Sequence, residues 1–65
     1  MKVIVNGAPT DISAETLAAA LVELKYANMT VATALNSDFV PEARRPATPL
    51  KDGDRIEIIG PMSGG

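Results

Sequence analysis

The last two residues of the sequence, Gly64 and Gly65, are the part best suited to chemistry, because they present an α-carboxylate on a backbone without side chains. Glycine has no Cβ, so such an end can enter a channel too narrow for any other residue. An α-carboxyl group has a pKa of about 3.3–3.7 and is ionised at pH 7, so no nucleophile displaces its oxygen until the group is activated. The end of the chain is either a functional tail that enters a partner's cleft or a frayed terminus of small residues.

The rest of the composition offers few reactive groups. The sequence contains no cysteine and no histidine, the residue types that supply most thiolate nucleophiles, general acid–base groups and zinc ligands. We therefore predict that the protein is not an enzyme by itself and that it binds no metal ion or cofactor.

Length and charge narrow the class of protein further. A chain of 65 residues with 46% apolar residues is typical of one small soluble domain. Its net charge of −2 argues against nucleic acid, which requires clustered basic residues, and the adjacent Arg44 and Arg45 indicate a solvated loop. Met1 and Lys2 lead directly into a β-branched run without the apolar segment of a signal peptide, and there is no apolar run of membrane-spanning length. We expect a cytoplasmic protein with no membrane partner.

A turn and a strand lead towards the terminal glycines. Asp52-Gly53-Asp54 predicts a turn whose Asp side chains accept hydrogen bonds from nearby backbone N–H groups. Residues 55–58 alternate charged and apolar side chains, which indicates a strand with its isoleucines in the core. Ile59 breaks the alternation, so we predict that its side chain points to solvent.

The strand should end at Gly60 and the proline after it, because proline has no N–H for the ladder. We therefore divide the chain into a domain over residues 1–59 and a flexible tail over residues 60–65. Fully extended, the tail reaches at most roughly 20 Å beyond the domain. The residues expected to line a partner's channel are Pro61, Met62, Ser63 and Gly64. Ile59 and Met62 are the candidate apolar anchors for docking a partner.

The first part of the chain predicts a hairpin. Residues 2–5 are rich in β-branched side chains, and Asn6-Gly7 is the strongest short signal for a type I′ turn. Pro9 lies in the returning strand, residues 8–12, which places that strand at an edge of the sheet. The side chains expected to face inward are Val3, Val5 and Ile12.

A helix should follow the hairpin. Ser13 and Thr16 are both possible N-caps, and we favour Thr16, since it immediately precedes the apolar stripe. That stripe consists of Leu17, Ala20, Leu21 and Leu24. We predict a helix that runs from Leu17 to about Tyr26, with Asn28 as the left-handed residue that ends it.

The middle of the chain predicts further strands. Residues 30–35 indicate a strand whose inward face the pattern leaves open, either Val31, Thr33 and Leu35 or the two alanines. After a turn at residues 36–38, Phe39-Val40-Pro41 reads as a short strand in which Phe39 packs in the core or at an edge. Residues 42–49 are polar and hold two prolines, so we expect an irregular excursion before Leu50 returns to the core.

The order of elements predicts an α+β fold, in which a mixed sheet of four to five strands packs on one main helix. The chain resembles the ubiquitin-like β-grasp sulfur carriers, and within them the ThiS family of thiamine biosynthesis. The resemblance spans nearly the whole chain and rests on Val3-Ile4-Val5-Asn6-Gly7, Thr16-Leu17, Val31-Ala32-Thr33-Ala34-Leu35-Asn36, Phe39-Val40-Pro41, the run LKDGDRIEII from Leu50 to Ile59, Pro61 and Gly64-Gly65. A terminal Gly-Gly alone is a weak signal, but after LKDGDRIEII in a chain this short it is a strong one. Met62-Ser63 departs from the bulkier aliphatic or Ala residues also familiar at these positions.

The resemblance implies a mechanism and a set of partners. An E1-like adenylating enzyme of the ThiF type uses ATP and Mg²⁺ to convert the carboxylate of Gly65 into an acyl-adenylate. A persulfide sulfur donor then yields a thiocarboxylate, and a thiazole synthase of the ThiG type takes the sulfur for the thiazole of thiamine. The carrier binds no cofactor of its own, and apart from its carboxylate every catalytic group belongs to a partner.

Three other functions remain open. The chain resembles the small subunit of molybdopterin synthase in fold and chemistry, although members of that group tend to be longer. It could also be a ubiquitin-like protein modifier that is attached to lysines through Gly65, or a plain binding module with a frayed end.

Overall fold

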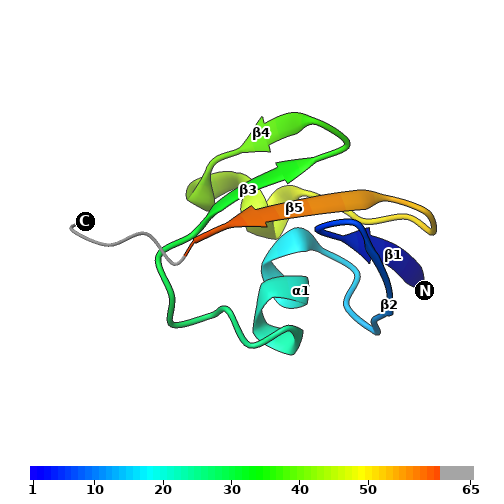
Figure 1. The fold of residues 1–65 in the computed structure, drawn as a ribbon. Helices are drawn as coiled ribbons and strands as arrows, with labels where there is room; N and C mark the ends of the chain where they lie inside the picture. The colour runs from blue at the N-terminus through cyan, green and yellow to red at the C-terminus, as the bar shows by residue number, and fades with distance from the viewer. Residues whose placement is uncertain (61–65) are drawn as a thin grey trace.

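The computed structural model describes residues 1–60, and residues 61–65 lie outside that part. The elements in chain order are β1 (Lys2–Val5), β2 (Ala8–Asp11), α1 (Leu17–Glu23), β3 (Ala32–Leu35), β4 (Asp38–Val40), the 3₁₀ helix η1 (Glu42–Ala47) and β5 (Arg55–Ile59). The strands form a five-stranded sheet in the order β2-β1-β5-β3-β4, and α1 packs against one face of it (Figure 1). This is the predicted mixed sheet on one main helix.

The hairpins β1–β2 and β3–β4 lie on either side of β5, which joins them into one sheet. β1 pairs with β5 in parallel, whereas β1 with β2, β3 with β4 and β3 with β5 pair antiparallel. Asn6 and Gly7 have φ values of 48° and 86°, as the predicted type I′ turn requires. The strand that contains Pro9 lies at an edge, which confirms the expectation from its missing N–H.

The hydrophobic core lies between the sheet and α1. Its buried residues are Val3, Ile12, Leu17, Ala20, Leu21, Val31, Val40, Leu50, Ile56 and Ile58, with Val5, Leu24 and Leu35 partly buried against them. Most of the positions predicted to face inward from β1, β5 and the helix stripe are in this set. Thr33 is also buried, so the inward face of β3 is the one that carries Val31, Thr33 and Leu35.

The start of the helix is as predicted, but its end is not. Oγ1 of Thr16 accepts a hydrogen bond from Ala19 N at 3.2 Å, which confirms Thr16 as the N-cap. The helix stops at Glu23, and Lys25, with φ of 71°, is the left-handed residue in place of Asn28. Our prediction of a helix to about Tyr26, ended by Asn28, is therefore wrong, because the chain leaves the helical conformation earlier.

The segment from Glu42 to Ala47 is more regular than predicted. It forms the 3₁₀ helix η1, so the predicted irregular excursion is wrong over these residues. Arg45 is not a solvated loop residue: Nε donates to Oγ1 of Thr33 at 3.0 Å and Nη2 donates to the carbonyl of Val31 at 2.7 Å. Arg45 therefore fastens η1 to β3 and to the residue before it, whereas Arg44 is exposed.

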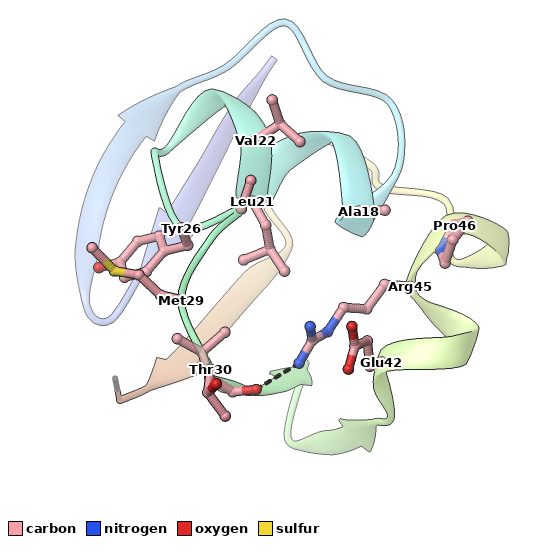
Figure 2. A pocket seen from close by; sticks show the side chains of 11 residues that line it. Ala18, Leu21, Val22, Tyr26, Met29, Thr30, Glu42, Arg45 and Pro46 are labelled. Carbon is pink, nitrogen blue, oxygen red and sulfur yellow. Dashed lines mark hydrogen bonds between the residues drawn. The ribbon is translucent and has the colours of Figure 1, made fainter. Parts of the chain in front are cut away.

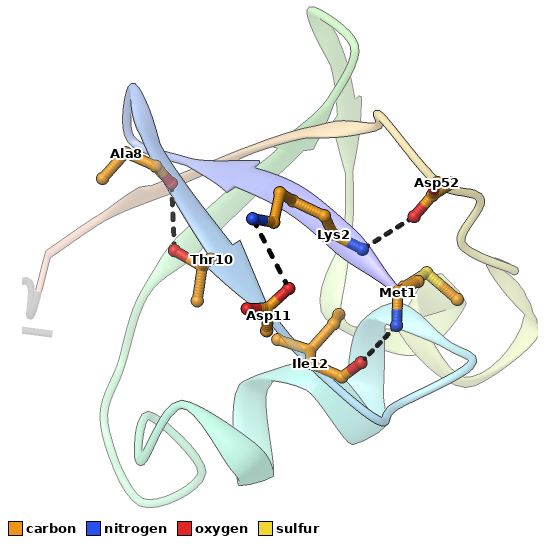
Figure 3. Close-up of polar contacts among 7 residues, drawn as sticks. All are labelled: Met1, Lys2, Ala8, Thr10, Asp11, Ile12 and Asp52. Carbon is orange, nitrogen blue, oxygen red and sulfur yellow. Dashed lines mark hydrogen bonds and ion pairs between the residues drawn. The ribbon is translucent and has the colours of Figure 1, made fainter.

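The other edge of the sheet is held by contacts around Met1 and Lys2 (Figure 3). The amino group of Met1 donates to the carbonyl of Ile12 at 2.7 Å, and Lys2 N donates to Oδ1 of Asp52 at 2.7 Å. The ion pair between Lys2 and Asp11, at 3.8 Å, joins two exposed side chains and contributes little to stability. The contact with Asp52 ties the turn before β5 to β1. The predicted local bond of this turn is made by Asp54, which accepts from Lys51 N at 2.7 Å.

Candidate functional site

The candidate site is the C-terminal end of β5, from which the tail continues. β5 ends at Ile59, and the end of this strand lies far from the N-terminus of the chain (Figure 1). Ile56 and Ile58 are buried, whereas the side chain of Ile59 is 65% exposed, so its predicted outward orientation is confirmed. Gly60 follows with φ of 129°, a conformation that favours glycine.

The tail residues assigned to chemistry and to the partner's channel, Pro61, Met62, Ser63, Gly64 and Gly65, lie outside the described residues. Of the predicted site, the structure therefore places Ile59 and the strand that leads to the tail. The role of Met62 as a second docking anchor stays a prediction.

The beginning of β5 is fixed by a buried carboxylate. Asp54 is 6% exposed, and its two oxygens accept hydrogen bonds from Lys51 N at 2.7 Å and from Nδ2 of Asn36 at 3.0 Å. Oδ1 of Asn36 in turn accepts from Arg55 N at 2.9 Å. These bonds join the β3–β4 turn to the first residue of β5, at the end of the strand opposite to the tail.

An apolar surface lies beside Ile59 on the face of the sheet opposite to α1. Directly paired residues of antiparallel strands share a face, and Ala32 pairs with Ile59 while Ala34 pairs with Phe39. We call these four residues, Phe39, Ala34, Ala32 and Ile59, the outward strip. The exposed Glu57, which pairs with Ala34, lies beside the strip on the same face. The strip leads from the edge strand β4 to the point where the tail begins.

Phe39 is the residue that sequence reasoning missed. Its side chain is 70% exposed, so the core position is wrong, whereas the edge position agrees with its place on the edge strand β4, where it points to the open face. The neighbouring Val40 is buried instead. A strand of three residues has too few alternations to show which face is inward, and the only usable signal was that one of Phe39 and Val40 had to point outward.

A separate pocket lies on the helix side of the sheet. It has a volume of about 330 Å³ and is bounded by α1, the loop after it and η1, with Leu21, Met29 and Arg45 among its lining residues (Figure 2). The guanidinium of Arg45 in this pocket already donates to the carbonyl of Val31. The guanidinium of Arg45 thus has a structural role, and the pocket lies on the face of the sheet opposite to the outward strip.

Two further kinds of site, a metal site and a membrane-spanning helix, are absent from the described part of the chain. Within residues 1–60 there is no group of three or more acidic, His or Cys side chains placed to hold a metal ion. No helix in the same range is both long and apolar enough to cross a membrane.

Comparison with known proteins gives a consistent result. The sequence model of the ThiS family matches residues 3–65. The sulfur carrier protein ThiS of Thermus thermophilus is 35% identical over 60 residues, which is 92% of this chain and 94% of the relative. The crystal structure of the thiamine biosynthesis protein ThiS from Geobacter metallireducens has a TM-score of 0.82 at 35% identity and covers all of both chains. A solution structure of a thiamine biosynthesis protein from the same organism has a TM-score of 0.78 over the whole of this chain and 88% of the other.

Proposed function

The chain belongs to the ThiS family, and on that premise we propose that it is a sulfur carrier of thiamine biosynthesis whose Gly65 carboxylate becomes a thiocarboxylate. The observation that carries the proposal is the extent of the family match, which runs to residue 65 and so includes both terminal glycines. The absence of cysteine supports it, because no thiol of the chain could hold the sulfur instead.

The proposed reaction has three steps at Gly65. An oxygen of the carboxylate attacks the α-phosphorus of ATP and pyrophosphate leaves, which gives an acyl-adenylate, while Mg²⁺ neutralises charge on the phosphates. The terminal sulfur of a persulfide donor then attacks the carbonyl carbon and AMP leaves. A thiol then attacks the donor's sulfur in the resulting acyl disulfide. A disulfide forms between this thiol and the donor, and the thiocarboxylate leaves. The adenylating enzyme, of the ThiF type, holds ATP and Mg²⁺, and the carrier binds no cofactor.

The position of the outward strip is compatible with a carrier that binds one partner enzyme after another. The outward strip lies beside the beginning of the tail, so a partner that covers Ile59 and Phe39 would have Gly65 within about 20 Å of that contact. We propose that the adenylating enzyme covers this strip, with Met62 as a further anchor in the tail. After sulfur loading, a thiazole synthase of the ThiG type takes the same surface and removes the sulfur.

The test is the intact mass of the chain after incubation with a cognate adenylating enzyme, Mg-ATP, a persulfide donor and a thiol. We expect one oxygen to be replaced by sulfur, with the change localised to Gly65 by fragmentation. An unchanged mass, with the same enzymes active on another carrier, would refute the proposal.

Gly64→Val is the matched variant for this experiment. It adds a branched Cβ that a channel shaped for two glycines excludes, and a misplacement of about 1 Å can cost on the order of 10²-fold in rate. We expect sulfur loading to collapse while the free energy of unfolding stays within about 0.5 kcal/mol of wild type. Early unfolding of this variant would show that residue 64 belongs to the core.

A further inference from the structure

The hydrogen-bond ladder between β1 and β5 continues beyond β1 through a side chain. β1 ends at Val5, and Asn6 N still donates to the carbonyl of Ile56 at 2.9 Å. In a regular parallel ladder the next bond would run from Ile58 N to the backbone carbonyl of residue 6. Instead, Ile58 N donates to Oδ1 of Asn6 at 2.8 Å, and Nδ2 of Asn6 donates to the carbonyl of Ile58 at 3.1 Å.

The turn explains why a side chain is needed here. The chain reverses at Asn6-Gly7, so residue 8 already belongs to β2, on the far side of β1 from β5. The N–H and C=O of one strand residue point to the same side, so both polar groups of Ile58 face the end of β1. A primary amide carries the same donor and acceptor as a peptide unit. The amide of Asn6 therefore takes the place of the missing backbone and pairs with both groups.

We propose that Asn6 is a positioning residue that holds the C-terminal end of β5 and so fixes the place and direction from which the tail continues. On the opposite side, this end of β5 is held by the pairing of Ile59 with Ala32. Without the amide, Ile58 has two unpaired backbone groups, and the last residues of β5 separate from the sheet more easily. The part that concerns delivery of Gly65 to the adenylating enzyme rests on the function proposed above.

Asn36 supplies a matched control at the other end of the same strand. It also occupies a turn, with φ of 50° against 48° for Asn6. Its side chain likewise bonds β5, since Oδ1 accepts from Arg55 N at 2.9 Å. Glycine accepts positive φ at both sites and adds the same freedom to the unfolded chain. A difference in amide hydrogen exchange between Asn6→Gly and Asn36→Gly therefore shows which end of β5 has been released.

The first test is amide hydrogen exchange on the free full-length chain, normalised to the slowest core amides. Ile59 is the reporter, because its backbone pairs with β3 and makes no bond to Asn6. We expect exchange at Ile59 to be at least about tenfold faster in Asn6→Gly than in Asn36→Gly. Equal rates at Ile59 in the two variants, with acceleration confined to Ile58, would overturn the proposal.

The second test is the KM of the adenylation reaction for the carrier. We expect Asn6→Gly to raise this KM by about threefold or more with kcat nearly unchanged, and Asn36→Gly to leave both near wild type. If the two variants have equal KM values but unequal exchange rates at Ile59, Asn6 holds the end of β5 but has no role in the delivery of Gly65. If the wild-type chain is not adenylated, the proposed function fails, while the exchange comparison still decides the structural part.

Discussion

Arg45 shows how much a single side chain contributes to a domain with a small core. Its guanidinium reaches from η1 to the hydroxyl of Thr33 and to the carbonyl of Val31, and Oγ1 of Thr33 itself donates to the carbonyl of Val40 at 2.7 Å. Thr33 and Val31 are both buried, so their polar atoms depend on partners within the protein. Arg45 thus completes a chain of hydrogen bonds that joins η1, β3 and β4.

Replacing Arg45 should therefore cost more than replacing its neighbour. Arg45→Met keeps an apolar stem but leaves the carbonyl of Val31 without its donor, and we expect the free energy of unfolding to fall by about 1–3 kcal/mol. Arg44→Met is the control, because Arg44 is exposed, and its effect should stay within about 0.5 kcal/mol. Urea unfolding of both variants measures the difference, and similar losses would show that Arg45 acts only through its charge.

The end of α1 has a Schellman motif without glycine. Lys25 N donates to the carbonyl of Val22 at 3.1 Å and Tyr26 N donates to the carbonyl of Leu21 at 2.8 Å, the two bonds that define the motif. The residue between the helix and Tyr26 must adopt positive φ, and here Lys25 does so at 71°. The motif also brings the partly buried Tyr26 against the core.

The sequence predicted some elements more accurately than others, for physical reasons. Strands and turns were predicted well where the pattern is local: Asn6-Gly7 marks a type I′ turn, and alternation over residues 55–58 orients β5. The helix end was missed because Lys25 is a residue type that rarely takes positive φ, so the sequence carries no signal there. The orientation of Phe39 and the bonds of Arg45 depend on which strands become neighbours, and a local pattern does not contain that information.

Lys25→Gly should stabilise the protein. Relief of the left-handed conformation is worth about 1–2 kcal/mol and exceeds the entropy cost of glycine, about 0.5–1 kcal/mol, so we expect a net gain of about 0.5–1 kcal/mol. In a domain of this size that gain corresponds to a rise in Tm of roughly 2–8 °C. Ala27→Gly is the control, because Ala27 does not have positive φ, and it should lower Tm slightly. A fall in Tm for Lys25→Gly would mean that the lysine side chain is needed where it lies.

At the scale of the whole molecule, the two faces of the sheet differ in what covers them. One face is covered by α1 and forms the core, and the pocket beside η1 lies on that side. The other face is not covered by α1 (Figure 1). It presents Phe39, which is 70% exposed on the edge strand β4, and Ile59, which is 65% exposed at the end of β5. Exposed apolar side chains also occur on the helix side, where Val22 is 64% exposed. Exposure alone therefore does not identify a docking face, and our proposal for the outward strip rests on the position of Ile59 at the end of β5.

The docking face can be tested with three similar substitutions. Phe39→Thr and Ile59→Thr remove apolar area and place a β-branched residue suited to a strand, and Val22→Thr replaces an exposed apolar side chain on α1 with the same residue type. Each change in the outward strip should weaken binding to the adenylating enzyme by about 1–2 kcal/mol, the range of an interface anchor, which raises Kd about 5- to 30-fold. Val22→Thr should leave Kd within about twofold, because α1 faces away from the strip. Titration of each variant into the enzyme, after thermal unfolding has shown that all three are folded, gives the comparison. A larger effect from Val22→Thr than from the two strand variants would place the docking surface on the helix side and move it away from the end of β5.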